Sequence, residues 1–131
     1  MSASESGLCP CGSGREYGSC CGPLHEGGAA ETAEQLMRSR FSAFARGRAD
    51  YLLASWHPST RPVELDLDDG VTWRRLQIVD AVAGTADDAE GTVEFRASYR
   101  DPDGSAGLLH ERSRFVRDEG GRWSYLDGET R

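Results

Sequence analysis

The stretch 32-TAEQLMRSRFSAFARG-47 predicts an amphipathic helix around which the rest of the chain is arranged. Thr32 and Gln35 have the spacing of a capping box, in which the two side chains bind free N–H groups at a helix start. Gly47 stands where a left-handed helix end needs glycine. The apolar residues between them recur with the spacing of one buried helical face, at Ala33, Leu36, Met37, Phe41 and Phe44.

The residues after this helix predict a second helix and then a sheet. The second helix is expected after Asp50, a good N-cap residue, and ends before Pro58. The alternation at 63–67 fits either a short edge strand or a covering loop. Two helices followed by an antiparallel meander predict an α+β fold, with helices packed on a curved sheet. Four strands are expected, separated by turn-forming residues, at 73–82, 92–99, 108–116 and 122–126.

The composition fits one domain with room for a small satellite. Of 131 residues, 15 are arginine, none is lysine and 22 are acidic, so the formal net charge is −7. A negative chain is a poor general binder of nucleic acid or anionic membranes, and we expect neither as a partner. No apolar run has the length of a membrane helix, and the start MSASESGLCP lacks a signal-peptide layout, so we expect a cytoplasmic protein.

Upstream of the long helix, the chain carries all of its cysteines, Cys9, Cys11, Cys20 and Cys21. Disulfides do not persist in a reducing cytosol, and adjacent cysteines bridge only with strain. Tetrahedral zinc, by contrast, accepts four thiolates delivered as two close pairs. We therefore predict one structural zinc ion per chain. A disulfide pair and free, redox-active thiols are the alternatives.

His25 follows the last cysteine closely enough to replace a thiolate as a ligand or to hydrogen-bond to one. The alternative is a solvated loop histidine with no role at the metal. The stretch 27-GGAA-30 then predicts a flexible joint. We expect two units, a zinc-binding segment at 1–30, called the hook below, and an α+β domain at 31–131, called the cone. The joint is expected to separate their two cores.

Residues 9–25, CPCGSGREYGSCCGPLH, resemble the SEC-C motif, first known from the tail of the ATPase motor of the Sec preprotein translocase. In that protein the motif is a small zinc hook that binds the export chaperone and other partners. The resemblance implies that the four cysteines are the zinc ligands and that the hook binds a protein partner.

The body of the chain is similar to the uncharacterised YchJ family, which joins a SEC-C hook to a cone domain of the nuclear-transport-factor-2-like, or cystatin-like, fold. The resemblance implies a pocket at the open end of the cone and no established reaction. The stretches that carry it are LMRSRFSAF (36–44), DYLLASWHP (50–58), GTVEFRASY (91–99), HERSRF (110–115) and GRWSYLDG (121–128).

Several residues of the cone are candidates for a pocket or for structural ion pairs. On the third strand, His110 and Arg112 share one face and Glu111 lies on the other. Arg40 borders the buried face of the long helix, and Glu111 is one partner that it could reach from there. A buried Arg–Glu pair, a ligand-binding or catalytic cluster and a solvated face are the alternatives. The full set is Arg40, His57, His110, Glu111, Arg112 and Asp127.

Two functions follow from these observations. The first is a zinc-binding adaptor whose hook contacts a protein partner, with a homodimer left open. The second is a small-molecule enzyme or ligand carrier that uses the cone pocket. Four thiolates leave no open metal position for water, so the metal itself is not expected to catalyse a reaction. A pocket lined by unpaired polar groups would favour the second function.

Overall fold

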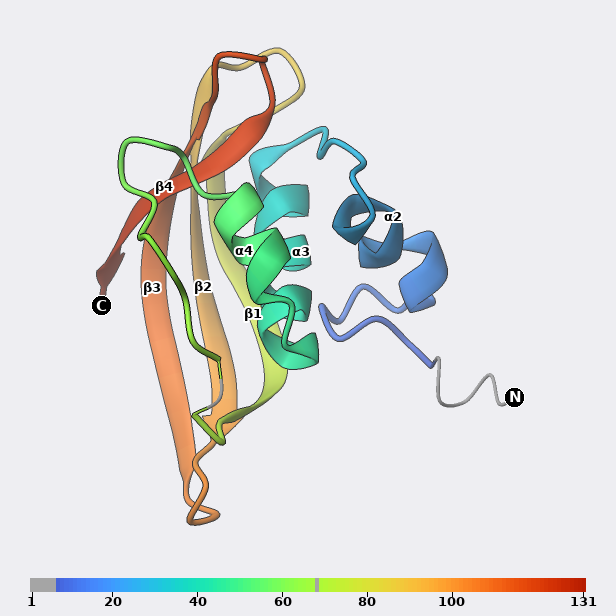
Figure 1. Cartoon of the computed structure of the whole chain (residues 1–131), viewed down its shortest axis with the longest axis vertical. Coiled ribbons are helices and arrows are strands. Elements are labelled where there is room, and N and C mark those ends of the chain that lie inside the picture. The colour runs from blue at the N-terminus through green and yellow to red at the C-terminus, as the bar shows by residue number, and fades with distance from the viewer. Residues whose placement is uncertain (1–6, 68) are drawn as a thin grey trace.

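The computed structural model describes residues 7–67 and 69–131 and places three layers side by side, the hook, two helices and a sheet (Figure 1). The strands form one antiparallel sheet in the order β1-β2-β3-β4. The predicted α+β fold is confirmed. In chain order the elements are η1 (Tyr17–Ser19), α2 (Cys21–His25), α3 (Ala33–Arg46), α4 (Ala49–Ala54), β1 (Thr72–Ala83), β2 (Glu90–Arg100), β3 (Ala106–Arg117) and β4 (Trp123–Thr130).

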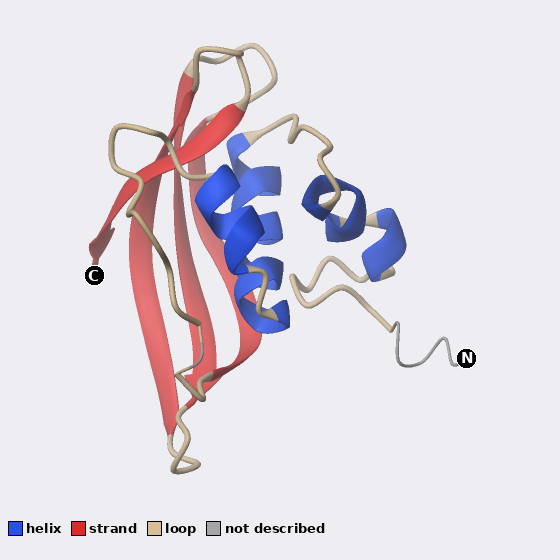
Figure 2. Cartoon of the chain, viewed as in Figure 1, coloured by secondary structure: helices blue, strands red, loops and turns tan. Residues whose placement is uncertain are grey.

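Helix α3 forms where the sequence predicts it and lies against the sheet (Figure 2). Its apolar side chains are part of the core. The Thr32 hydroxyl accepts a hydrogen bond from the backbone N–H of Gln35, and the Gln35 side chain accepts one from the backbone N–H of Glu31. Gly47 ends the helix at a φ of 70°. The core that results joins α3 to all four strands through Leu36, Met37, Phe41, Leu76, Val93, Phe95, Phe115 and Trp123.

Three details differ from the sequence prediction or extend it. Asp50 is not the N-cap of α4, because the helix already begins at Ala49 and the Asp50 carboxylate binds the side chain of Arg48. The described residues at 63–67 form a loop between α4 and β1 and no strand, and Val63 is 99% exposed. Strand β4 continues to Thr130, because Asp127–Thr130 still pair with β3.

The hook packs on the side of α3 that faces away from the sheet (Figure 1). Its buried cysteines form a small cluster of their own, whereas Leu24 on α2 belongs to the core of the cone. The joint at 27–30 therefore does not keep the two cores apart, contrary to expectation. The domain boundary at residue 30 stays a prediction.

Candidate metal centre

The four cysteine sulfurs lie close together next to α3. All four Sγ atoms lie within 4.8 Å of one another, with 3.6 Å between Cys11 and Cys20 and 4.0 Å between Cys20 and Cys21. Four thiolates at about 2.3 Å from a tetrahedral ion would lie roughly 3.8 Å apart. The cysteines are free thiols, and three of the four are buried. The donor set therefore fits a four-coordinate thiolate site.

Two local turns bring the sulfurs together. Around Cys9 and Cys11 the chain folds back on itself through an antiparallel bridge between Leu8 and Glu16, and the N–H of Cys9 donates to the carbonyl of Arg15. The second pair, Cys20 and Cys21, stands where η1 passes into α2. Gly22 is required there, because a Cβ would lie 2.8 Å from the carbonyl oxygen of Tyr17.

Two serine hydroxyls contact the sulfurs, and the sequence analysis missed the one on α3, that of Ser42. Ser42, on α3, donates to Sγ of Cys21 at 3.2 Å and lies 3.3 Å from Sγ of Cys9. Ser13 lies 3.2 Å from Sγ of Cys20. Ser42 is fully buried, so α3 forms one wall of the site. The sequence does contain a second helical face of small residues at Ser39, Ser42 and Ala43, but that face does not indicate what it contacts.

The thiols lie so close together that their pKa values are shifted in opposite directions. Hydrogen bonds from the thiols of Cys11 and Cys21 hold the pKa of Cys9 well below its ordinary value. The pKa of Cys21 is raised, because its thiol donates to Cys11 and Cys9 and because it is buried. The first thiolate to form thus makes the next harder to form. A divalent cation removes this conflict by compensating the charge of all four thiolates.

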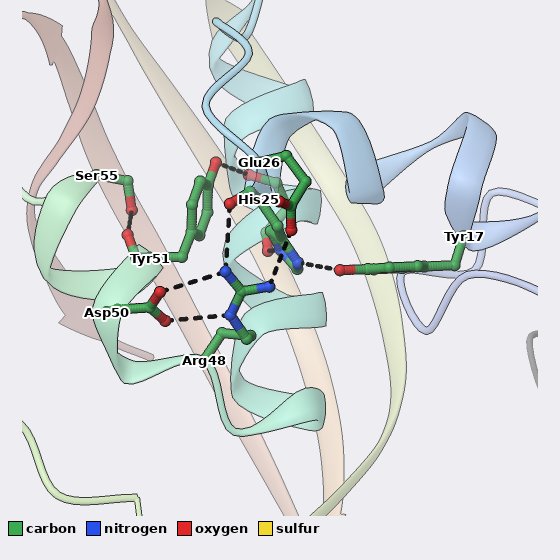
Figure 3. Close-up of polar contacts among 8 residues, drawn as sticks. Tyr17, His25, Glu26, Arg48, Asp50, Tyr51 and Ser55 are labelled. Atoms are coloured by element: carbon green, nitrogen blue, oxygen red, sulfur yellow. Dashed lines mark hydrogen bonds and ion pairs between the residues drawn. The ribbon is translucent and has the colours of Figure 1, made fainter.

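His25 is held away from the sulfurs by contacts at both ring nitrogens. Nε2 lies 2.8 Å from the carbonyl oxygen of Ser39, which can only accept, so this nitrogen carries the proton. Nδ1 lies 2.6 Å from the hydroxyl of Tyr17 (Figure 3). Burial lowers the pKa of His25, so the ring is neutral and Tyr17 donates to it. His25 therefore fastens the hook to α3 and lies outside the sulfur cluster.

Arg48 clamps the end of α2 to the start of α4 (Figure 3). It donates to the backbone carbonyl of His25 at 3.3 Å, lies 3.7 Å from the Glu26 carboxylate, and binds both oxygens of Asp50. The Arg46 guanidinium also contacts the hook, 3.9 Å from the ring centre of Tyr17. These contacts fix the orientation of the hook on the helical layer.

Of the six predicted pocket residues of the cone, two line one cavity and four lie elsewhere. Arg40 and Glu111 line the same partly open cavity between α3 and the sheet. The expected ion pair between them is not formed within the described part of the chain. Instead, one terminal nitrogen of Arg40 donates to the carbonyl of Leu52 and to the hydroxyl of Ser55. Burial lowers the pKa of Arg40 to about 10.

The other four candidates lie outside this cavity. His110 and Arg112 share the Glu94 carboxylate on the opposite face of the sheet, at 2.7 and 3.1 Å. Asp127 binds Arg114 through two hydrogen bonds. His57 lies after α4, where its Nδ1 contacts Ser59. Arg112 and Asp127 also line one surface pocket, but the structure does not bring all four candidates together into one site.

The fold and the site define a class of protein, an NTF2-like α+β domain that carries a four-cysteine motif on its helical side. The chain belongs to the YchJ family. The family model described as "YchJ, middle NTF2-like domain" matches residues 32–128, and the model of the SEC-C motif matches residues 8–23. A UPF0225 protein of Streptomyces coelicolor is 56% identical over 122 residues, which are 92% of this chain and 94% of that protein.

Solved structures show the same arrangement. The solution structure of a SEC-C motif containing protein from Rhodopseudomonas palustris has a TM-score of 0.79 and 35% identity, covering 92% of this chain and 96% of that one. The crystal structure of a SEC-C motif containing protein from Psychrobacter arcticus has a TM-score of 0.74 and 29% identity, covering 91% and 80%. No helix in the described part of the chain has the length and apolar character needed to span a membrane.

Proposed function

We propose that this protein is a zinc-binding adaptor, in which one zinc ion held by Cys9, Cys11, Cys20 and Cys21 orders the hook for contact with a protein partner. The observation that carries the proposal is the convergence of the four sulfurs to within 4.8 Å, close to the spacing of a tetrahedral thiolate site. Such a site needs reduced cysteines, which favours the cytoplasm as its compartment.

Metal analysis of the purified full chain tests the first half of this proposal. We expect about one zinc ion per chain and no visible absorbance, whereas an iron tetrathiolate would be coloured. Cys20→Ser should lower the zinc content sharply. The neighbouring change Ser19→Ala is the matched control and should leave it unchanged. A folded protein without metal, or with iron at full occupancy, would overturn the assignment.

The hook presents two features that suit a protein contact. Leu8 is 67% exposed at its outer edge. A groove of about 350 Å³ runs between the hook and α3, with the half-buried Cys20 and the side chains of Arg15 and Arg38 along it. A similar motif in the Sec translocase motor binds protein partners, which supports a protein as the partner of this hook.

Site-specific photo-crosslinking in the producing cell tests the second half. A crosslinking residue at position 8 should give a discrete protein adduct, and the adduct should disappear when Cys20→Ser is added. The same residue at Val82, which is exposed on β1, is the control position and should give no such adduct. Absence of an adduct at position 8, or equal adducts at both positions, would count against an adaptor role for the hook.

A further inference from the structure

A pocket of about 120 Å³, partly open to solvent, lies in the cone between α3 and the sheet. The hook lies on the opposite side of α3 (Figure 1). Its apolar wall is made by Met37 and Phe44 on α3, Phe95 on β2 and Leu109 on β3. An engineered cavity of roughly 150 Å³ in another protein holds a benzene ring. The closed part of this pocket therefore has about the size of one small ring, and a polar head can extend toward its opening.

One end of the cavity carries hydrogen-bond donors that are not all used. Arg40 is 3% exposed, and its guanidinium lies 4.4 Å from the ring centre of Tyr125. A guanidinium has five N–H groups, and the contacts with Leu52 and Ser55 involve one terminal nitrogen. Within the residues that the structure describes, Nε and the second terminal nitrogen have no hydrogen-bond acceptor.

Trp56 adds a second unused donor beside Arg40. Its indole nitrogen is buried and has no hydrogen-bond partner among residues 7–67 and 69–131. Its ring centre lies 5.1 Å from the Arg40 guanidinium, and both residues line the cavity. A buried indole N–H ordinarily has a partner, because leaving it unpaired costs free energy.

A carboxylate also lines the cavity. Glu111, on β3, accepts a hydrogen bond from the Ser113 hydroxyl through Oε2. Glu111 and Arg40 lie too far apart for an ion pair, so the cavity offers a cation with free donors and a carboxylate acceptor at separate points. Its net charge is near zero.

We propose that this cavity binds a small molecule with a ring-sized apolar body and an uncharged head that carries an acceptor and a donor side by side, as a primary amide does. The acceptor takes N–H bonds from Arg40 and Trp56, and the donor binds the Glu111 carboxylate. An anionic head would be repelled by Glu111, and a cationic head by Arg40. The proposal does not depend on the adaptor role of the hook.

Three probes that share one ring test the proposal, namely benzamide, benzoate and benzamidine. Each is titrated into the zinc-loaded full chain while the indole N–H resonance of Trp56 is followed by NMR. We expect saturable shifts with benzamide and at least tenfold weaker binding of the two charged probes. A Trp56 resonance that does not respond to benzamide, or equal affinity for all three probes, would overturn the proposal.

Two conservative variants separate the donor side from the acceptor side. Trp56→Phe keeps an aromatic ring but removes the N–H, and should weaken benzamide binding roughly threefold to tenfold, followed on the amide resonance of Phe95. Glu111→Gln removes the negative charge and should strengthen benzoate binding at least fivefold. The matched control Glu94→Gln makes the same change on the opposite face of the sheet and should change neither affinity. Unaltered benzoate binding by Glu111→Gln would contradict the proposed charge pattern.

Discussion

At the scale of single residues, two buried serines of α3 hold the hook on the cone, Ser42 through its hydroxyl and Ser39 through its backbone carbonyl. A buried hydroxyl without a partner costs free energy, so its bonds show what it is placed to hold. Ser42 contacts two of the four sulfurs, and Ser39 presents its carbonyl to His25 and its hydroxyl to Tyr51. Both serines are fully buried. One face of the long helix thus packs in the core of the cone, and another face contacts the cysteine cluster.

Ser42→Ala should leave the fold intact and weaken metal binding. The hydroxyl donates to Sγ of Cys21, and a hydrogen bond to a thiolate stabilises its negative charge. We expect zinc affinity to fall roughly tenfold to a hundredfold, the range found when groups that support metal ligands are removed. Competition with a chromophoric chelator measures it. Ser124→Ala, at a buried serine of β4 that bonds to Val116, is the control. Equal affinity of Ser42→Ala and wild type would mean that the hydroxyl only fills space.

Glu94 predicts a specific pH dependence of stability. Hydrogen bonds from His110 and Arg112 lower its pKa below the ordinary value of 4.5. Folding therefore favours the carboxylate, and the stability it contributes is present above the unfolded pKa and lost as the pH falls through the folded pKa. Urea unfolding between pH 6 and 3 should show a smaller loss of stability for Glu94→Gln than for wild type. Acid release of zinc affects both proteins alike. Parallel curves would contradict the prediction.

The four cysteines could be predicted from sequence because they are close neighbours in the chain and their chemistry is distinctive. Ser42 could not, because it is far along the chain from both sulfurs and a serine in a helix ordinarily indicates an exposed position. The partner of Arg40 was missed for a related reason. Strand alternation places Glu111 on the inner face, but it does not say how far along that face the helix lies.

At the scale of elements, the long helix and the second to fourth strands follow from a periodicity that reflects one buried face, whereas β1 buries only Leu76 fully. The segment at 63–67 has the same alternation but no strand to pair with, and it forms a loop. The start of α4 at Ala49 was also missed, because a side-chain cap was assumed where Asp50 instead binds Arg48. Alternation and capping residues thus indicate elements only where tertiary partners exist.

Leu24 on α2 tests whether a hook element supports the cone. It is 5% exposed and belongs to the core that contains Leu36 and Trp123. Leu24→Ala should therefore lower the free energy of unfolding by about 3 kcal/mol, the cost typical of a buried leucine. Leu8→Ala makes the same change in the hook at an exposed position and should cost far less. Urea unfolding followed by far-UV circular dichroism measures both, and a small effect of Leu24→Ala would indicate that the cone stands alone.

At the scale of the whole molecule, arginine side chains join the two units of a chain that is net acidic. Arg38, Arg48 and Arg122 donate to hook carbonyls at Cys11, His25 and Gly27. A guanidinium suits this position because it offers several donors in one plane. These bonds form only when the backbone of the hook has its ordered shape. The metal state of the hook should therefore affect the stability of the entire molecule.

Removal of zinc should consequently destabilise the whole chain in one step. A disordered hook exposes Leu24 and releases the contacts of His25, and the loss of a structural ion removes its binding free energy from the folded state. Thermal unfolding of the chelator-treated protein should remain a single transition at a lower temperature, and Cys20→Ser should behave in the same way. Ser19→Ala should match wild type with and without chelator. Two transitions, with the upper one unmoved by chelation, would show instead that the hook melts alone and that the cone does not depend on it.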